Sequence, residues 1–274
     1  MWTLSGFADE IDPDLDLQVA TITQLGLNYL EFRSAWDTNV LDLTDAQVEE
    51  VRSTLSAAGL QVSAIGSPIG KIGIEEDFGP HTDRMRRAVD VAQALDTGYI
   101  RIFSFFTGNQ DPTSVRDEVL RRMDALATIA AEADLVLVHE NEKGIYGDVP
   151  ARCADLVTSV DNPHLRLAWD AANFVQVGVR PFSEGYELLR EHLEYVQIKD
   201  ALLADGTVVP AGAGDGQVRE TMRALAADGF DGFFSLEPHL SAVGTFGGFS
   251  GPNLFSEAHR AFTAILDEEK IAYS

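Results

Sequence analysis

Short apolar runs and longer amphipathic runs alternate along the whole chain. The short runs are typical of strands, and the amphipathic runs repeat their apolar positions with the period of a helix. The predicted strands cover residues 2–7, 28–33, 60–66, 99–105, 134–140, 165–169, 193–199 and 231–237. The predicted helices cover residues 14–25, 44–58, 81–95, 113–132, 150–160, 183–190, 218–227 and 255–270.

Eight successive strand–helix units predict a parallel sheet that closes into a barrel. Local signals support the helix limits: Thr44 is a predicted N-cap, Gly59 ends the same helix, and Pro150 stands in a first turn. No linker or low-complexity stretch interrupts the pattern. We therefore predict an α/β protein with a single (β/α)8 TIM-barrel domain over residues 1–274.

Polar residues gather where the predicted strands end, and four of them carry oxygen donors: Glu140, Asp170, Gln197 and Glu237. The C-terminal ends of barrel strands surround one mouth, which is where barrel enzymes hold their active sites. Three carboxylates and an amide oxygen in one mouth repel one another unless a cation joins them. Hard divalent ions prefer this oxygen set, whereas a zinc site would show more histidine or cysteine. The pattern therefore predicts a divalent-metal site.

Charge and composition narrow the partners. The chain has 44 acidic and 20 basic residues, a net charge of −24. This charge repels the phosphates of nucleic acids. No apolar run is long enough to span a bilayer, and the acidic N-terminus lacks the pattern of a signal peptide. The single cysteine, Cys153, lies on the predicted buried face of a helix. We expect a cytoplasmic protein that binds neither nucleic acid nor membrane.

The motifs at the strand ends follow a familiar order: GFADEI, YLEFR, SPIGK, YIRIFSFF, HENEKGIYGD, WDAANF, YVQIKDA and SLEPH. Over nearly the whole chain this order resembles the xylose isomerase-like TIM-barrel family of sugar isomerases and epimerases, which includes sugar phosphate enzymes. In that family Glu, Asp, His and Glu hold a divalent metal. The matching positions are Glu140, Asp170, Gln197 and Glu237, with Gln197 where histidine is usual. Asn173 stands where the family often has another histidine.

The resemblance implies a metal-dependent isomerase or epimerase that acts on a ketose or hydroxy ketone through an enediolate. Glu140 and Glu237 would be the acid–base pair. The cofactor would be Mn²⁺ or Mg²⁺, with Zn²⁺ or Co²⁺ as alternatives. The expected substrate-binding residues are Lys199, His239, Arg101 and Lys71. Members of the family often form dimers or tetramers, so we expect a homo-oligomer.

Several of these residues also have a purely structural interpretation. Lys199 would otherwise form a salt bridge to Asp200 or Glu237, and Arg101 an ion pair inside the barrel. Gln197 would then be only a hydrogen-bonding neighbour of the site.

Three glycine-containing segments are further candidates. Residues 67–71 (SPIGK) invite a phosphate-binding interpretation without matching a Walker loop, and residues 212–216 (GAGDG) predict a mobile loop that touches substrate. Residues 239–253 predict a lid or an oligomer contact.

Other functions compete with the sugar isomerase or epimerase. A metal-dependent dehydratase or lyase would use the same enolate chemistry. A non-catalytic sugar-binding barrel would have lost its metal, as Gln197 suggests. A DNA-repair nuclease of the endonuclease IV type shares the fold, but the six histidines and the net charge of −24 oppose it. A neutral sugar or polyol fits the acidic surface better than a phosphorylated one.

Overall fold

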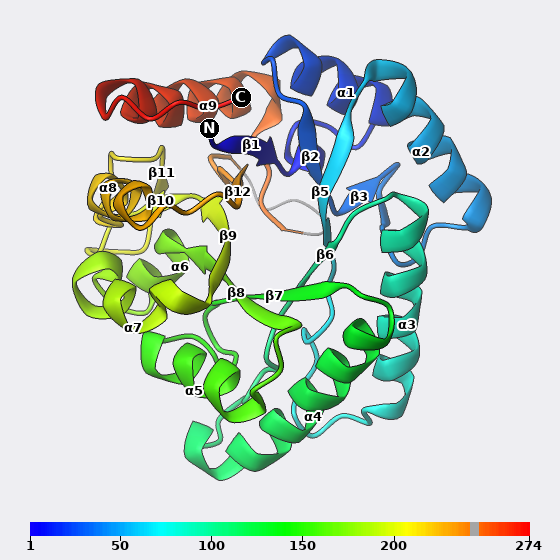
Figure 1. Ribbon diagram of the computed structural model, residues 1–274, viewed down its shortest axis with the longest axis vertical. Helices are drawn as coiled ribbons and strands as arrows, with labels where there is room; N and C mark the ends of the chain where they lie inside the picture. Colours follow the sequence, from blue (N-terminus) through cyan, green and yellow to red (C-terminus); the bar gives the residue numbers. More distant parts are fainter. Residues whose placement is uncertain (242–246) are drawn as a thin grey trace.

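Eight parallel strands form a nearly closed barrel in the computed structural model, which describes residues 1–241 and 247–274 (Figure 1). The barrel strands are β1 (Thr3–Gly6), β2 (Tyr29–Phe32), β5 (Gln61–Gly66), β6 (Tyr99–Ile102), β7 (Val136–Glu140), β8 (Leu165–Asp170), β9 (Leu193–Ile198) and β12 (Phe233–Leu236). They pair in the order β1-β12-β9-β8-β7-β6-β5-β2, and a bridge between Phe7 and Glu31 links β1 to β2. The predicted (β/α)8 barrel is confirmed.

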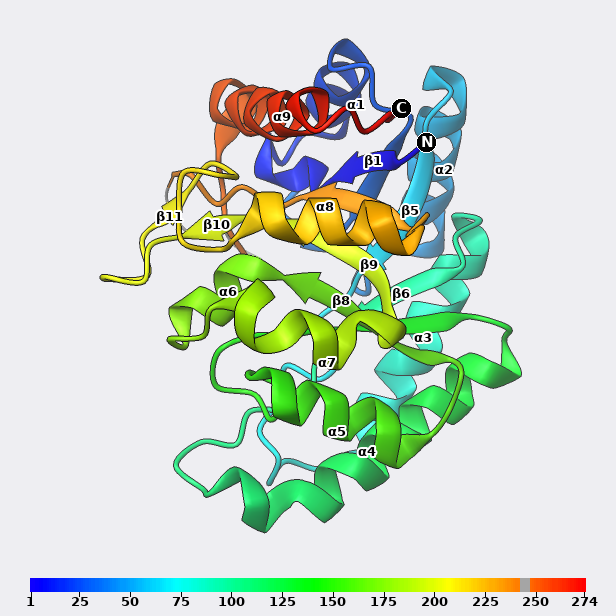
Figure 2. The ribbon, with the colours of Figure 1, turned by 60° about the vertical axis from the view of Figure 1, so that its left-hand side comes forward.

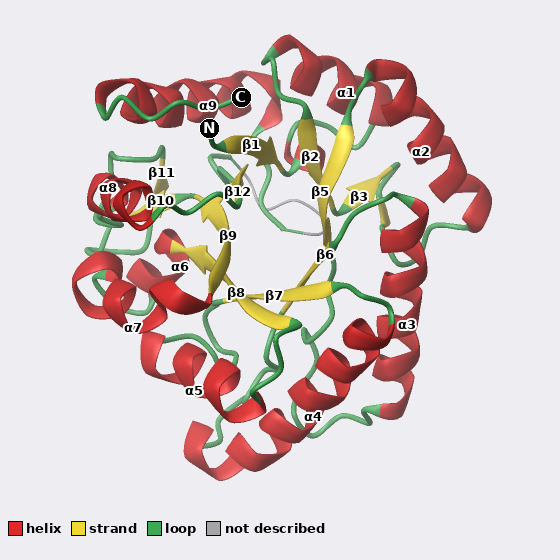
Figure 3. Ribbon diagram, in the orientation of Figure 1, coloured by secondary structure: helices red, strands yellow, loops and turns green. Residues whose placement is uncertain are grey.

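Helices form a ring outside the strands, as Figure 3 shows. The longer ones are α1 (Leu15–Gln24), α2 (Asp45–Ala58), α3 (Gly79–Ala94), α4 (Pro112–Glu132), α5 (Pro150–Val160), α8 (Val218–Asp228) and α9 (Gly251–Glu268). The helix-limit signals are confirmed. The Thr44 side chain accepts the Gln47 N–H in a capping box, and Gly59 ends α2 with φ 72°.

Cys153 is buried on α5, and burial raises the pKa of its thiol well above its usual range.

The segment between β8 and β9 differs from the prediction of one helix over 183–190. It contains α6 (Ala171–Gln176), a π-helical turn (Phe182–Tyr186), α7 (Glu187–Leu189) and a 3-10 turn (Arg190–His192). The side chain of Asp170 accepts the N–H of Asn173, so a helix begins directly after the strand. Six residues are too few for a helical period to be recognised in the sequence.

Short additional elements follow the C-terminal ends of three barrel strands, β1, β2 and β9. They are the 3-10 turn Ala8–Glu10, the antiparallel pair β3 (Ser34–Ala35) and β4 (Thr38–Asn39), and the antiparallel pair β10 (Asp200–Ala201) and β11 (Val208–Val209). Figure 2 shows β10 and β11 on the side of the molecule opposite to the two chain termini. These elements were not predicted, because two residues carry no period.

A small apolar layer inside the barrel supports the mouth. Ala64, Val138, Ala168 and Tyr195 form a buried cluster separate from the main core between strands and helices. Val138 and Ala168 each stand two residues before the last residue of their strand. Side chains alternate along a strand, so Glu140 and Asp170 lie on the same inner face, one layer higher.

No helix in the described part of the chain is both long and apolar enough to cross a membrane.

Candidate active site

The barrel brings the four predicted oxygen donors to one mouth. Glu140 ends β7, Asp170 ends β8, Gln197 is in β9, and Glu237 directly follows β12. All four side chains are buried. One carboxylate oxygen from each of Glu140, Asp170 and Glu237 lies within 4.8 Å of the others. We call these three residues the carboxylate triad.

Glu140 is surrounded by donors. Arg101 Nη1 lies 2.6 Å from its Oε2, and Asn173 Nδ2 donates to its Oε1 at 2.9 Å. With its amide nitrogen turned toward Glu140, Gln197 donates to both carboxylate oxygens at 3.1 Å. Burial, and then the charge of Glu237, raise the pKa of Glu140, while Arg101 opposes the rise. Gln197 is thus a hydrogen-bonding neighbour of Glu140, which is one of the two roles that the sequence allowed. Its other role, as a metal ligand, stays a prediction.

Asp170 is held by its backbone and by one of its oxygens. The side chain of Asn141 pairs with the Asp170 main chain, donating to its carbonyl and accepting its N–H, each at 2.9 Å. Oδ1 accepts the N–H of Asn173, which leaves Oδ2 facing Lys199. Burial raises the pKa of Asp170 to about 7, although the ammonium of Lys199 opposes this shift.

Glu237 is contacted by three cationic side chains. Lys199 Nζ donates to its Oε2 at 2.8 Å, and Arg33 Nη1 donates to its Oε1 at 3.3 Å. His239 Nε2 lies 3.3 Å from the same Oε1. Burial alone would raise the pKa of Glu237, but these neighbouring charges, led by Lys199, hold it well below its usual range. Glu140 and Glu237 therefore share a mouth but differ in their tendency to hold a proton.

Lys199 lies within the triad. Its Nζ is 2.8 Å from Asp170 Oδ2 as well as 2.8 Å from Glu237 Oε2, and its side chain is 3% exposed. The expected salt bridge to Glu237 is present. Asp200, the other expected partner, has a different role.

Asp200 organises the GAGDG loop. Its carboxylate accepts the backbone N–H groups of Gly212, Gly214 and Gly216 at 2.8–3.0 Å. An added Cβ at Gly214 or Gly216 would collide with this carboxylate. The loop that the sequence predicts to be mobile is instead fastened to Asp200, and its glycines allow that close approach. Its contact with substrate stays a prediction.

Three residues that follow the first two strands, Asp9, Glu10 and Arg33, contact the site but are not among the predicted site residues. Arg33 Nε lies 2.8 Å from Asp9 Oδ2, so this guanidinium joins Asp9 to Glu237. Glu10 accepts the backbone N–H of His239 at 2.9 Å. The motifs GFADEI and YLEFR contain these residues, and the signal that could have found them was their polarity directly after apolar strands.

The remaining predicted substrate residues line the mouth. His239 lies beside Glu237 and Glu10. Burial and the charge of Lys199 lower the pKa of its imidazole, but these two carboxylates outweigh them and raise the pKa to about 9. Lys71 Nζ lies 2.9 Å from Glu142 Oε2 and 4.2 Å from the centre of the Phe103 ring. The charge of the SPIGK lysine is therefore already paired with a carboxylate. The glycine-rich segment 239–253 lies partly outside the described residues.

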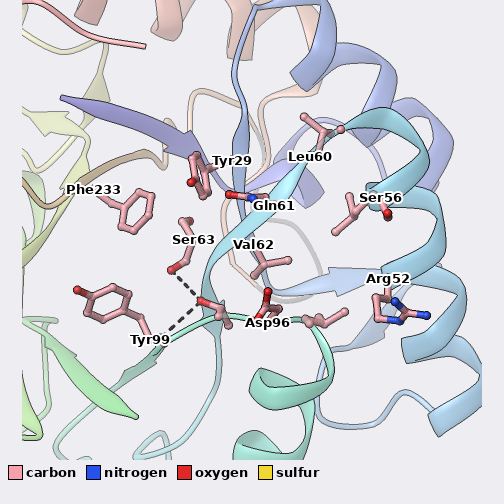
Figure 4. Close-up of a pocket in the computed structure, with 15 residues that line it drawn as sticks. Tyr29, Arg52, Ser56, Leu60, Gln61, Val62, Ser63, Asp96, Tyr99 and Phe233 are labelled. Carbon is pink, nitrogen blue, oxygen red and sulfur yellow. Dashed lines mark hydrogen bonds between the residues drawn. The ribbon is translucent and has the colours of Figure 1, made fainter. Parts of the chain in front are cut away.

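Each end of the barrel has a cavity. The mouth holds a cavity of about 370 Å³, whose lining includes Lys71, Arg101, Glu140, Lys199, Glu237 and His239. A larger one, of about 510 Å³, opens at the N-terminal ends of the strands, where Tyr29, Gln61, Ser63, Tyr99 and Phe233 line it (Figure 4). Barrel chemistry belongs to the C-terminal end, and the carboxylate triad is there. The smaller cavity is therefore the candidate active site.

The donor set of the triad fits a hard divalent cation. Three buried carboxylates from three different strands offer oxygens within 4.8 Å of one another, and Mg²⁺ or Mn²⁺ binds such ligands. The triad is therefore a carboxylate site suited to a divalent cation.

The fold and this site define a (β/α)8 barrel with a carboxylate site at the C-terminal ends of its strands. The chain belongs to the xylose isomerase-like TIM barrel family, whose model matches residues 19–264. The resemblance seen in the motifs is thereby confirmed.

One curated relative is the 2-epi-5-epi-valiolone 7-phosphate 2-epimerase of Actinoplanes sp., which is 26% identical over 177 residues. The match spans 64% of this chain and 64% of the length of that relative.

Solved structures share the fold. A D-tagatose 3-epimerase-like protein superposes with a TM-score of 0.77 at 14% identity, covering 98% of this chain and 100% of the other. A xylose isomerase-like TIM barrel protein from Mycobacterium smegmatis, in complex with magnesium, has a TM-score of 0.72 at 18% identity over 99% and 97% of the two chains. The probable 3-DHS dehydratase of Bacillus anthracis has a TM-score of 0.74 at 17% identity over 96% and 98%.

Proposed function

We propose that this protein is a divalent-metal-dependent isomerase or epimerase of a ketose or a related hydroxy ketone. One observation carries the proposal: two glutamates from strands on different sides of the barrel, Glu140 and Glu237, face one buried mouth together with Asp170. Inversion of a carbon beside a carbonyl uses two acid–base groups, one on each face of that carbon. The relative named a 2-epimerase supports this reaction class.

Glu140, Asp170, Gln197 and Glu237 are the residues that would hold the metal. When bound there, a divalent ion would supply the positive charge that stabilises an enediolate. The carbonyl oxygen of the Gln197 side chain would face the metal, while its amide nitrogen would still donate to Glu140.

The chain's own residues move the proton. One glutamate of the pair takes the proton from the carbon next to the carbonyl, and the other returns a proton to the opposite face, which inverts that centre. Return from the first glutamate to the neighbouring carbon, with transfer of the hydroxyl proton from one oxygen to the other, gives isomerisation instead. Asn173 and Arg101 hold Glu140 in place through hydrogen bonds to its two oxygens, and Arg33 holds Glu237.

The mouth also selects the substrate by its polarity. Arg101, Lys199 and His239 line the cavity and are oriented by carboxylates, so hydroxyl and carbonyl oxygens of a small polyol would meet donors there. The cavity of about 370 Å³ suits one small molecule.

Proton exchange in D2O tests this function. The protein is incubated with Mn²⁺ or Mg²⁺ and a panel of ketoses and hydroxy ketones, and deuterium at the carbon beside the carbonyl is followed by NMR. Exchange with an inverted or isomerised product supports the proposal. A product that has lost water would replace it with the dehydratase, and absence of exchange on the whole panel would favour the sugar-binding barrel.

A further inference from the structure

The ammonium of Lys199 occupies the place between two members of the carboxylate triad. It donates a hydrogen bond to Glu237 and forms an ion pair with Asp170, with both N–O distances at 2.8 Å. Arg101 contacts Glu140, and Arg33 contacts Glu237. Each carboxylate of the triad therefore already touches at least one fixed positive charge.

The barrel topology puts Lys199 there. β9 lies between β8 and β12 in the sheet, and β8 carries Asp170 while β12 leads into Glu237. Gln197 pairs in register with Asp170 on one side and with Ser235 on the other. Lys199 follows Gln197 by two residues, so alternation directs both side chains to the inner face of the barrel. A long side chain at this position reaches the gap between the two neighbouring carboxylates.

A divalent ion and this ammonium need the same oxygens. A metal bound by Asp170 and Glu237 would stand next to the ammonium of Lys199, whose burial weakens the screening of the repulsion between the two charges. Two cations cannot share the pair of carboxylates at contact distance, and the side chain of Lys199 lines a cavity into which it can turn.

We propose that Lys199 is a resident counter-ion that a divalent metal must displace from Asp170 and Glu237, so that metal and ammonium exclude one another at this site. This inference rests on the metal site of the proposed function. It gives Lys199 two positions: between the carboxylates without metal, and in the substrate cavity with metal. In the second position its ammonium is a donor to substrate oxygens.

Amine labelling of the unaltered protein tests the displacement. The chain has only four lysines, Lys71, Lys143, Lys199 and Lys270, so reductive methylation can be followed at each by mass spectrometry. Without metal, Lys199 should react slowly because it is buried. Saturating Mg²⁺ should accelerate its labelling at least about tenfold, with no change at the exposed Lys270. Mg²⁺ that raises the melting temperature while Lys199 stays protected would overturn the inference.

Metal affinity gives an independent test. Lys199→Met removes the competing charge and should bind Mn²⁺ at least about tenfold more tightly than the unaltered protein in calorimetric titrations. Lys143→Met, which changes an exposed lysine in the lining of the same cavity, is the matched control and should bind as the unaltered protein does. Equal or weaker binding by Lys199→Met, or no Mn²⁺ binding by any of the three proteins, would contradict the proposal.

These measurements use no substrate, so their failure can be told apart from failure of the proposed function. Displacement of Lys199 without proton exchange on any substrate would contradict the proposed function and support the role of Lys199 as a counter-ion. Metal-dependent proton exchange while Lys199 stays protected would support the proposed function and contradict the role of Lys199.

Discussion

Arg101 Nη1 lies 2.6 Å from Glu140 Oε2, and both side chains are buried inside the barrel mouth. The pair joins two neighbouring strands, β6 and β7, and it fixes the orientation of the carboxylate to which we assign proton transfer.

Loss of the charge on Glu140 should abolish turnover. Glu140→Gln keeps the size of the side chain, but it replaces one acceptor oxygen by an NH2 group and cannot accept a proton, so we expect kcat to fall by about 10²–10⁴. The matched control is Glu194→Gln, at the opposite end of the barrel, where Glu194 accepts a hydrogen bond from Tyr99. Deuterium exchange by NMR measures both variants. Full activity of Glu140→Gln would remove Glu140 from catalysis.

Removal of Arg101 should destabilise the fold. Arg101→Met leaves Glu140 buried without its guanidinium, which should cost about 3–5 kcal/mol in the free energy of unfolding measured with urea. The double variant Arg101→Met with Glu140→Gln should be destabilised by at least about 1 kcal/mol less than the sum of the two single variants. Strict additivity would show that the two residues do not depend on one another.

Low pH should destabilise the loop that carries Lys71, because protonation of His81 removes a hydrogen bond to that loop. The backbone N–H of Gly70 donates to His81 Nε2 at 2.7 Å, which requires a neutral ring. Burial, followed by the charges of Arg84 and Arg122, lowers the pKa of His81 to about 4. The unfolded chain, with an ordinary histidine pKa near 6.5, binds more protons between these two values. Stability from this residue is therefore complete above that window and declines as pH falls through it.

A comparison of two proteins isolates this contribution. His81→Gln keeps an acceptor near the position of Nε2 but does not titrate. The unaltered protein should lose about 1–2 kcal/mol more than the variant between pH 7 and pH 4.5 in urea unfolding. Parallel pH profiles would show that His81 does not respond.

Gly70 should not tolerate a side chain. It has φ 90°, and an added Cβ would overlap the carbonyl of Phe103. Gly70→Ala should lower the free energy of unfolding by at least about 1–3 kcal/mol and reduce turnover, because Lys71 follows directly. Gly98→Ala is the control, since a Cβ there meets no atom within 4 Å. Equal melting temperatures for the two variants would contradict the strain argument.

Divalent metal should stabilise the protein. At about 100 times its dissociation constant, Mn²⁺ or Mg²⁺ should add about 2.7 kcal/mol to the free energy of unfolding and raise the melting temperature, and a chelator should reverse the change. Asp170→Asn removes one carboxylate of the triad and should diminish the shift. A melting temperature that no divalent ion moves would contradict the metal-dependent mechanism.

The sequence by itself determined the barrel and the identity of its mouth. Strands of four to six residues and helices of ten or more each carry their own period, and caps such as Thr44 and Gly59 are local signals. Glu140, Asp170, Gln197 and Glu237 could be selected because the end of a strand is itself visible in the sequence. The resemblance to the family then supplied the chemistry expected of them.

The tertiary structure alone decided which charges meet. Arg33 and Glu237 are 204 residues apart, and only the order of strands around the barrel brings them into contact. Lys199 faces Asp170 and Glu237 while its neighbour Asp200 holds the glycine loop, because successive residues point to opposite sides of an extended chain. Burial and these neighbouring charges together shift the pKa values of the groups, and both are properties of the folded barrel that no local pattern contains.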